Sequence, residues 1–205
     1  SESASSFIMY STSGHSWVAM GDPVGLAAER EELIWKFRDL ADRAGRTVAF
    51  YEVSPESLPA YIDAGLSLSK LGEEARVALS GFTLAGSARA ELRQAHRRGQ
   101  REGLQFQIVP ATESDSRRDE LQALPSEWLS AKRVAEKGLS LGYFDAQYLR
   151  QFPTALVLLN GRIVAFANIW DTDSKTELSI DLMRHSNAAP RGTMDFLFVE
   201  LMLWG

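Results

Sequence analysis

Apolar and polar residues alternate along positions 177–184, as they do in a β-strand that buries one face. The alternation places three apolar residues together on that face: Leu178, Ile180 and Leu182. Ser179 and Asp181 then belong to the polar face, and Arg184 follows at the end of the stretch. We therefore expect a strand that carries a carboxylate and an arginine close to its end.

A loop with an arginine and a glycine follows this strand and leads into an apolar helix. The helix is expected to begin near Thr193 and to run to Trp204. The amides of a first helical turn have no partner within the helix and favour anions. The strand that carries Asp181 and Arg184 and the first turn of the following helix together predict a site for an anionic substrate. The alternative, that Asp181 is simply a solvated side chain on a polar strand face, stays open at this stage.

Periodicity also predicts the elements that precede this site. A helix is expected over about Ser87–Gly103 and a strand over Leu104–Val109. Two further helices should follow, broken near Pro125, with the second ending at Gly138. This part of the chain therefore alternates between helix and strand.

A β-meander is expected next. The strands Thr154–Leu159 and Arg162–Trp170 flank Asn160-Gly161, which is the strongest signal for a two-residue hairpin turn. The third strand is expected over Thr176–Met183. Three consecutive strands joined in this way form an antiparallel sheet.

The first half of the chain contains the same kinds of element. In order, we expect a hairpin (Phe7–Tyr10 and Trp17–Met20), a helix (Leu33–Ala44), a buried strand (Thr47–Val53), a helix (Pro55–Ala64) and a strand (Ala75–Leu79). These elements predict a mixed α/β (α+β) fold with largely antiparallel sheets in two similar domains, residues 1–84 and 85–205. A sheet normally needs its closing helix to lead to another strand, so the second domain is expected to be incomplete on its C-terminal side.

Composition narrows the chemistry. The 205 residues include no cysteine and only three widely spaced histidines, so neither thiolate chemistry nor a metal site is expected. No apolar run approaches the roughly 18 residues needed to span a bilayer. The net charge of −5 argues against extensive nucleic-acid coating, although it permits a local basic patch.

One local patch of this kind is present in the sequence. Four arginines are spaced four residues apart and share one helix stripe: Arg89, Arg93, Arg97 and Arg101. Such a stripe suits a phosphate backbone, which it would position without reading sequence. The alternative is a solvated helix face paired with acidic neighbours.

Aromatic residues and a helix cap complete the expectations. The five tryptophans lie on apolar faces and are expected in the core rather than as stacking platforms: Trp17, Trp35, Trp128, Trp170 and Trp204. Asp145 is expected to cap a helix that holds Tyr148 and Leu149.

Four segments of the sequence belong together as a set: Met20–Gly25, Lys70–Ala75, Arg162–Asn168 and Asp181–Arg184. Together they resemble the soluble domain of bacterial phosphatidylglycerol aminoacyltransferases of the multiple peptide resistance factor type, the lysyl- and alanyl-phosphatidylglycerol synthases. Asp-Leu-Met-Arg in combination with the downstream Gly-Thr-Met-Asp is the specific part of the resemblance.

The resemblance implies two tandem folds of the acetyltransferase (GNAT) type, as in the peptidoglycan Fem transferases. It implies a domain on the cytoplasmic face of the bacterial inner membrane, preceded by a membrane-embedded region of the same protein. The implied reaction moves an aminoacyl group from aminoacyl-tRNA to the glycerol hydroxyl of phosphatidylglycerol, without any cofactor. Alanyl is favoured over lysyl, from general likeness to the alanyl enzymes of Gram-negative bacteria, and both stay open. This modification alters membrane lipid charge and resistance to cationic antimicrobials.

Under this resemblance, Asp181 would orient or deprotonate the lipid hydroxyl, and Arg184 would pair with the lipid phosphate or the tRNA terminus. Arg191 and Gly192 would form the anion-binding helix start, with Ser179 and Asp195 as further substrate contacts. The arginine stripe would hold tRNA phosphates. Asp181 and Arg184 point to opposite faces of a regular strand, so the strand must end or bulge for both to meet one substrate.

Two other classes of function remain open. An acetyl-CoA-dependent N-acetyltransferase normally has a glycine-rich pyrophosphate loop, of which residues 189–194 are only a degenerate version. A non-catalytic module that binds tRNA or a membrane surface would use the arginine stripe but not Asp181.

Overall fold

The computed structural model describes residues 4–117, 120–124 and 144–205. The chain divides into two compact units, Ser1–Glu74 and Ala75–Gly205. The sequence pattern predicts this boundary ten positions later, between residues 84 and 85, since 84 − 74 = 10. Each unit has its own sheet, and each is treated by itself below.

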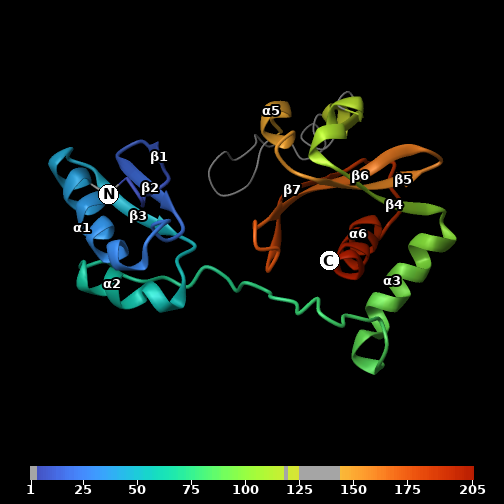
Figure 1. The fold of residues 1–205 in the computed structure, drawn as a ribbon, viewed down its shortest axis with the longest axis horizontal. Helices are drawn as coiled ribbons and strands as arrows, with labels where there is room; N and C mark the ends of the chain where they lie inside the picture. Colours follow the sequence, from blue (N-terminus) through green and yellow to red (C-terminus); the bar gives the residue numbers. More distant parts are fainter. Residues whose placement is uncertain (1–3, 118–119, 125–143) are drawn as a thin grey trace. The chain divides into compact units, whose positions relative to one another are not determined.

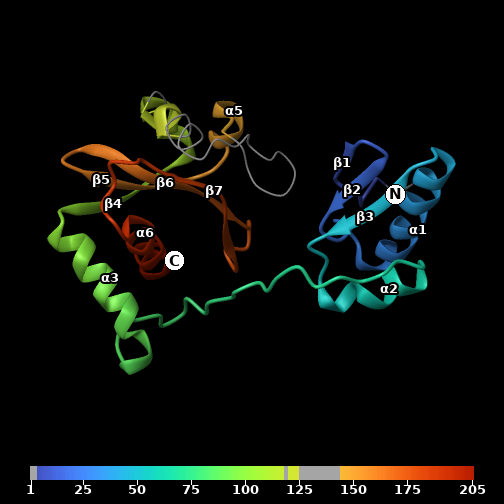
Figure 2. The same ribbon diagram turned by 180° about the vertical axis from the view of Figure 1, so that it is seen from behind.

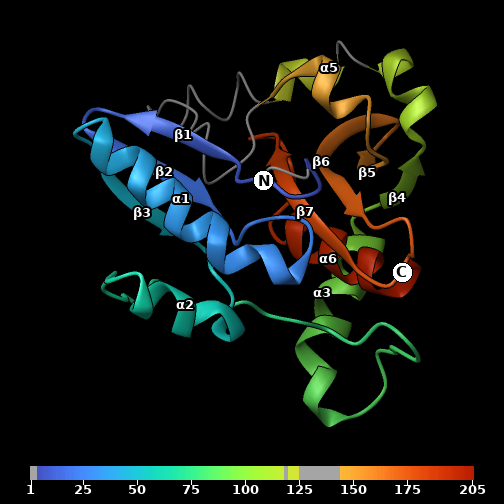
Figure 3. The ribbon, with the colours of Figure 1, turned by 60° about the vertical axis from the view of Figure 1, so that its left-hand side comes forward.

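The first unit is a three-stranded sheet with helix α1 against it (Figure 3). Its elements are β1 (Tyr10–Ser13), β2 (Ser16–Met20), α1 (Arg30–Arg43), β3 (Thr47–Tyr51) and α2 (Leu58–Asp63). Strands β1 and β2 form a hairpin as predicted, but its first strand begins at Tyr10, three residues later than expected. β3 adds to β2 in parallel after the α1 crossover. β3 is only half-buried, so the prediction of a buried strand there is wrong. It is an edge strand of a small sheet.

Aromatic side chains fill the space between α1 and this sheet. The ring of Phe37 contacts those of Tyr10, Trp17 and Phe50, at centroid distances of 5.1, 5.9 and 5.5 Å. Such edge-to-face and tilted contacts favour packing beyond the area they bury. Periodic apolar residues thus fold this unit as the sequence predicts.

Asp22, in one of the segments that carry the family resemblance, ties the loop after β2 to α2. Its carboxylate accepts hydrogen bonds from the Tyr61 hydroxyl at 2.8 Å and from the Ser54 amide at 3.1 Å. Burial, followed by the bond to Asp22, raises the pKa of Tyr61. Asp22 therefore has a structural role in the first unit.

The second unit is built on a four-stranded antiparallel sheet in the order β4-β5-β6-β7 (Figure 1). Its helices are α3 (Ala90–Arg101), α5 (Ala146–Leu149) and α6 (Thr193–Trp204), with 3-10 turns over Ser87–Arg89 and Ala111–Arg117. Its strands are β4 (Leu104–Val109), β5 (Thr154–Leu159), β6 (Arg162–Asp171) and β7 (Leu178–His185).

Helices cover both faces of this sheet (Figures 1 and 2). Helices α3 and α6 lie on one face, over what we call the α6-side core: Leu104, Ala155, Val157, Val164, Ala165, Ala167, Ile169, Phe196, Leu197 and Leu201. Helix α5 lies on the other face, over the α5-side core: Val109, Leu121, Leu124, Leu149, Leu156, Leu158, Ile163, Phe166 and Leu182. Since both faces are covered, β5 and β6 are apolar almost throughout.

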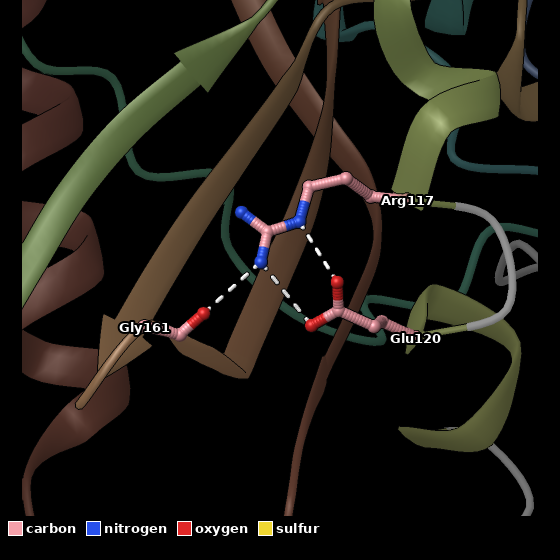
Figure 4. Close-up of polar contacts among 3 residues, drawn as sticks. All are labelled: Arg117, Glu120 and Gly161. Atoms are coloured by element: carbon pink, nitrogen blue, oxygen red, sulfur yellow. Dashed lines mark hydrogen bonds and ion pairs between the residues drawn. The ribbon is translucent and has the colours of Figure 1, made fainter.

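An ion pair connects the segment after β4 to the β5–β6 hairpin (Figure 4). Arg117 donates to both carboxylate oxygens of Glu120, at 3.0 and 3.2 Å, and to the carbonyl of Gly161 at 3.2 Å. The hydrogen bonds from Arg117 are the main reason that the pKa of Glu120 is lowered. The predicted hairpin turn is confirmed, because Asn160 and Gly161 both have positive φ, 51° and 77°.

One predicted strand does not form, and the predictions for two helix boundaries cannot be compared with the described residues. No strand forms over Ala75–Leu79: this segment, exposed over residues 75–78, pairs with neither sheet. The predicted break near Pro125 and the helix ending at Gly138 lie outside the described residues.

Candidate functional site

Strand β7 contains a β-bulge at Asp181 and Leu182. The pairing with β6 is regular on either side of it, with the pairs Ala167–Met183 and Ile169–Ile180. Two residues of β7 therefore lie opposite Asn168 alone. An extra residue of this kind shifts the alternation of all the side chains that follow.

The bulge changes which residues share a face. Leu178 and Ile180 pack against the α6-side core, whereas Leu182 belongs to the α5-side core. The prediction that all three share one face is therefore wrong at Leu182, because the period of two holds only up to the bulge.

The bulge also places Asp181 and Arg184 on the same face. The Asp181 carboxylate is bound by Tyr148, whose helix covers the α5 side of the sheet. Arg184 pairs across the ladder with Phe166, and the Phe166 ring lies in the α5-side core. Directly opposed residues of an antiparallel pair project to the same side. The sequence indicates that Asp181 and Arg184 can meet one substrate only if the strand ends or bulges. The structure contains this bulge.

A chain of hydrogen bonds holds the Asp181 carboxylate. The Trp170 indole N–H donates to the Tyr148 hydroxyl at 2.9 Å, and this hydroxyl donates to Oδ2 of Asp181 at 3.0 Å. Burial and the bond to Asp181 raise the pKa of Tyr148 to about 12. Tyr148 therefore stays protonated, and remains a donor, throughout the physiological pH range.

Asp145 positions Tyr148 on its short helix. Its carboxylate accepts the backbone N–H of Tyr148 at 2.8 Å, which confirms the predicted cap. The Phe152 ring packs against the rings of Tyr148 and Trp170, at centroid distances of 4.9 and 6.3 Å. The Tyr148 hydroxyl is thus held by its helix cap, its neighbouring rings and two hydrogen bonds.

Sequence reasoning did not identify Tyr148 or Trp170 as site residues. The prediction of a core position is wrong for Trp170, which is 40% exposed, and also for the exposed Trp35 and Trp204. Trp128 lies outside the described residues. The Asp145 cap was a local signal for the helix, but nothing local shows that Tyr148 reaches a strand 33 positions later.

The predicted substrate-binding residues fall into two groups. Ser179 pairs with Trp170 across β6 and β7, so it lies on the same face as Asp181. Arg191, Gly192 and Asp195 surround the start of α6, which packs on the opposite face of the sheet. Gly192 occupies the N-cap with a left-handed φ of 88°, a conformation that glycine adopts without strain.

The predicted arginine stripe is also divided in two. Arg89 and Arg93, near the start of α3, donate to backbone carbonyls of the preceding segment, those of Thr83 and of Leu84 and Gly86 respectively. Arg97 and Arg101 are exposed further along the same helix. An open depression runs along this helix face, lined by Ala90, Arg93, Gln94, Arg97, Gln100 and Arg101.

Two kinds of feature are absent from the described residues, 4–117, 120–124 and 144–205. These residues contain no cluster of histidine, aspartate and glutamate able to hold a metal ion. None of their helices has the length and apolar character that a membrane span requires.

The chain is similar over its whole length to a family of known proteins. Residues 1–205 match the family model described as phosphatidylglycerol lysyltransferase, C-terminal. The chain is 40% identical over 188 residues to a phosphatidylglycerol lysyltransferase of Bacillus subtilis (strain 168), and 30% identical over 204 residues to one of Staphylococcus aureus (strain MRSA252). These alignments cover 91% and 99% of the chain but only 22% and 24% of the relatives, so the chain spans about a quarter of their length.

Solved structures share the fold. The C-terminal domain of an Agrobacterium fabrum protein described as a lysylphosphatidylglycerol synthetase superposes with a TM-score of 0.93 at 46% identity. The L-PGS structure from Bacillus licheniformis gives a TM-score of 0.89 at 40% identity. The matches cover 98% and 100% of this chain, and 63% and 65% of the two solved chains.

Proposed function

Because the chain belongs to the family of phosphatidylglycerol lysyltransferase C-terminal domains, we propose that it takes part in the transfer of an aminoacyl group from aminoacyl-tRNA to the glycerol hydroxyl of phosphatidylglycerol. The observation that carries the proposal is the β7 bulge, which gives Asp181 and Arg184 a common face within a segment of the family motif. The reaction exchanges one ester for another, so it needs no cofactor.

Asp181 is the residue that we assign to the acceptor hydroxyl. Its Oδ2 accepts from Tyr148, whereas Oδ1 has no hydrogen-bond partner among the residues that the structure describes. A lipid hydroxyl that donates to Oδ1 is oriented for attack on the ester carbonyl carbon. The bond from that carbon to the tRNA ribose oxygen then breaks, and the hydroxyl proton ends on this oxygen. A carboxylate is a weak base for an alcohol, so orientation is its main role.

The arginine side chains would bind the phosphate groups of the two substrates. Arg184, on the face of Asp181, would pair with the lipid phosphate or the tRNA terminus, with Ser179 as a neighbouring contact. Arg191, Gly192 and Asp195 would form a second contact region for a substrate at the start of α6. Because the two regions belong to different faces of the sheet, we assign them to different parts of the substrates.

The arginines of α3 would hold tRNA. Arg97 and Arg101 are exposed, and they line the depression together with Arg93. Arg89 and Arg93 bind the carbonyls of the segment before α3, so they would shape this surface as well as contribute charge.

The remaining parts of the proposal rest on the family. General likeness to the alanyl enzymes favours alanyl as the transferred group, whereas the names of the relatives favour lysyl. The tandem acetyltransferase-like fold, the membrane-embedded region of the same protein and the location at the cytoplasmic face of the inner membrane belong to this proposal. An acetyl-CoA-dependent reaction is not favoured by any relative described above.

Transfer of label tests the proposal directly. The full chain encoded by the gene is incubated with phosphatidylglycerol vesicles and either radiolabelled lysyl-tRNA or alanyl-tRNA. Label in the lipid phase supports the proposed reaction, and the active tRNA identifies the amino acid. Asp181→Asn should lower kcat/KM at least about 100-fold, as expected for loss of a catalytic carboxylate, with little change in Tm.

The same preparation distinguishes the alternatives. Absence of transfer from both tRNAs by the folded protein would overturn the proposal. A rise in Tm with acetyl-CoA would indicate the N-acetyltransferase instead, because a ligand that binds only the native state stabilises it. Retention of tRNA binding by a folded protein that transfers no label would indicate a binding module, whereas transfer unaffected by Asp181→Asn would reject the role assigned to Asp181.

A further inference from the structure

We propose that Asn168 is a positioning residue, which sets the β7 bulge and thereby aligns Asp181 and Arg184 on one face of the sheet. The inference rests on the proposed function, because it concerns the same reaction. Asn168 lies on β6, next to the bulge, and its side chain is 0% exposed. It would not touch substrate, so it would act through β7.

The contact that carries the inference joins the Asn168 side chain to the bulge. Oδ1 of Asn168 accepts the backbone N–H of Leu182 at 2.6 Å, within the buried sheet. In a regular ladder such an amide bonds to a backbone carbonyl of the neighbouring strand. Here the side chain takes the place of that carbonyl, at the residue where the alternation changes.

Stability alone does not explain an asparagine at this position. Its Nδ2 has no hydrogen-bond partner among the described residues, and neither does Oγ1 of Thr154, which lies directly opposite on β5. A buried polar group without a partner costs free energy comparable to a lost hydrogen bond. An apolar residue would avoid this cost but would leave the buried Leu182 N–H without an acceptor, so the useful part of Asn168 is its bond to Leu182.

The same sheet contains a second bulge for comparison. Between β5 and β6 the register shifts at Val157 and Leu158, which adds Val164 to β6. The residues around this bulge are apolar and packed in the cores of the second unit. The bulge between β5 and β6 thus forms without a buried amide side chain. The bulge at Asp181, between β6 and β7, has such a side chain, that of Asn168.

Three variants, each with the heavy-atom shape of the residue it replaces, separate positioning from packing. Asn168→Leu removes both polar atoms, and Asn168→Asp keeps an acceptor for Leu182. Thr154→Val is the matched control, because Thr154 is equally buried, faces Asn168 and makes no bond to β7. Transfer of the aminoacyl group to phosphatidylglycerol is measured with the full chain from pH 6 to 8, together with Tm.

We expect Asn168→Leu to lower kcat at least about 30-fold with the KM for tRNA unchanged, because α3 is untouched. Thr154→Val should keep kcat within about twofold of the wild type. In Asn168→Asp, burial raises the pKa of the new carboxyl, so its neutral form replaces the amide at low pH. Its ionised form still accepts from Leu182 but adds a buried negative charge opposite Asp181, so activity should approach the wild-type value near pH 6 and fall as the pH rises.

Hydrogen exchange at the Leu182 amide gives a readout that does not depend on activity. Protection of this amide should be lost in Asn168→Leu and kept in Thr154→Val. Near wild-type kcat in Asn168→Leu, or equal losses in Asn168→Leu and Thr154→Val, would overturn the inference while wild-type transfer upholds the function. If the wild type itself transfers nothing, the proposed function fails, and unchanged Leu182 protection in Asn168→Leu would overturn the positioning role separately. If Asn168→Leu does not fold, a pH profile of Asn168→Asp parallel to that of the wild type overturns it.

Discussion

Single side chains around Asp181 limit one another's freedom. The Tyr148 hydroxyl accepts from Trp170 and donates to Asp181, so its proton has one direction available. A hydrogen bond to a charged group contributes about 1.5–3 kcal/mol, more than one between neutral groups. Tyr148 thus holds the Asp181 carboxylate in one orientation before any substrate arrives, which is what a reaction controlled by orientation requires.

Removal of the Tyr148 hydroxyl should reduce the rate without unfolding the protein. In Tyr148→Phe, Asp181 loses its donor, and we expect kcat/KM for aminoacyl transfer to fall roughly 10-fold. Trp170→Phe removes only the donor to Tyr148, so its loss should be smaller. Steady-state transfer assays of both variants test this order, and a larger loss in Trp170→Phe would contradict it.

The raised pKa values also predict a loss of stability in strong base. The pKa of Tyr148 is about 12 in the folded chain, against about 10 in the unfolded chain, and that of Tyr61 is raised as well. The folded state therefore retains these protons more firmly. The contribution of Tyr148 to stability is complete below pH 10 and is lost as the pH rises from 10 to 12, and that of Tyr61 also begins to fall above pH 10. Urea unfolding at pH 9 and 11 should show a smaller decrease for Tyr148→Phe than for the wild type.

At the level of elements, α3 and α6 are held against each other by a close approach and a hydrogen bond. The ring of Phe196, on α6, lies over Gly99 on α3, where a Cβ would be only 2.7 Å from the Phe196 Cγ. His96 contacts Glu200 at 2.9 Å and stacks on Phe196. The contact between these helices thus requires a residue without a side chain at position 99.

Gly99→Ala should therefore destabilise the protein although alanine is the better helix former. Alanine gains about 1 kcal/mol in helix propensity, but overpacking against the buried Phe196 costs about 1–3 kcal/mol. We expect a net decrease in the free energy of unfolding. Gln100→Ala, at the exposed neighbouring position, is the control and should leave that free energy unchanged or slightly higher. Equal stability of Gly99→Ala and the wild type would show that the ring can move.

The exposed arginines of α3, Arg97 and Arg101, are expected to contribute to tRNA binding. Arg97→Glu combined with Arg101→Glu should weaken tRNA binding and reduce the slope of log K against log salt by about 1 for each arginine–phosphate pair that no longer forms. Arg162→Glu, exposed at the start of β6, is the control for each of the two changes made singly, because one substitution of arginine by glutamate changes the net charge equally at any position. Titrations of labelled tRNA at several salt concentrations measure both effects, and equal losses in the control would reject the stripe as the binding surface.

At the level of the whole molecule, the chain consists of two units joined by an extended stretch. Residues 67–78 are exposed and form neither helix nor strand. Lys70 is paired there only with Glu73, at the surface, where such a pair contributes little. Each unit has its own core, so the two can be expected to survive a cut between them.

Limited proteolysis tests this division. Among the lysines and arginines that the structure describes, Lys70 and Arg76 lie in the exposed stretch, and trypsin should cleave there before it cleaves within helices. Mass spectrometry should then show fragments that end at Lys70 or begin after Arg76. Cleavage after Lys36, inside α1, at the same rate would contradict the division.

The sequence by itself determined the elements whose signals are local. Alternation and turn chemistry predicted the hairpin of β5 and β6, since Asn160-Gly161 suits a two-residue turn whatever surrounds it. Helical periodicity predicted α1, end signals at Ser87 and Gly103 predicted α3, and an apolar run after a glycine-containing loop predicted α6. The Asp145 cap predicted the start of α5. These features depend on residues within a few positions of one another.

Only the tertiary structure decided how the candidate site is assembled. The bulge depends on Asn168, which lies on the neighbouring strand 14 positions before Leu182. Tyr148 reaches Asp181 across 33 positions, and the arginines of α3 divide according to the carbonyls that the preceding segment presents. Periodicity in the sequence indicates which face a side chain would occupy in a regular strand. An extra residue in the strand reverses this alternation for the residues that follow. Whether a bulge forms depends on the hydrogen-bonding groups of the adjacent strand.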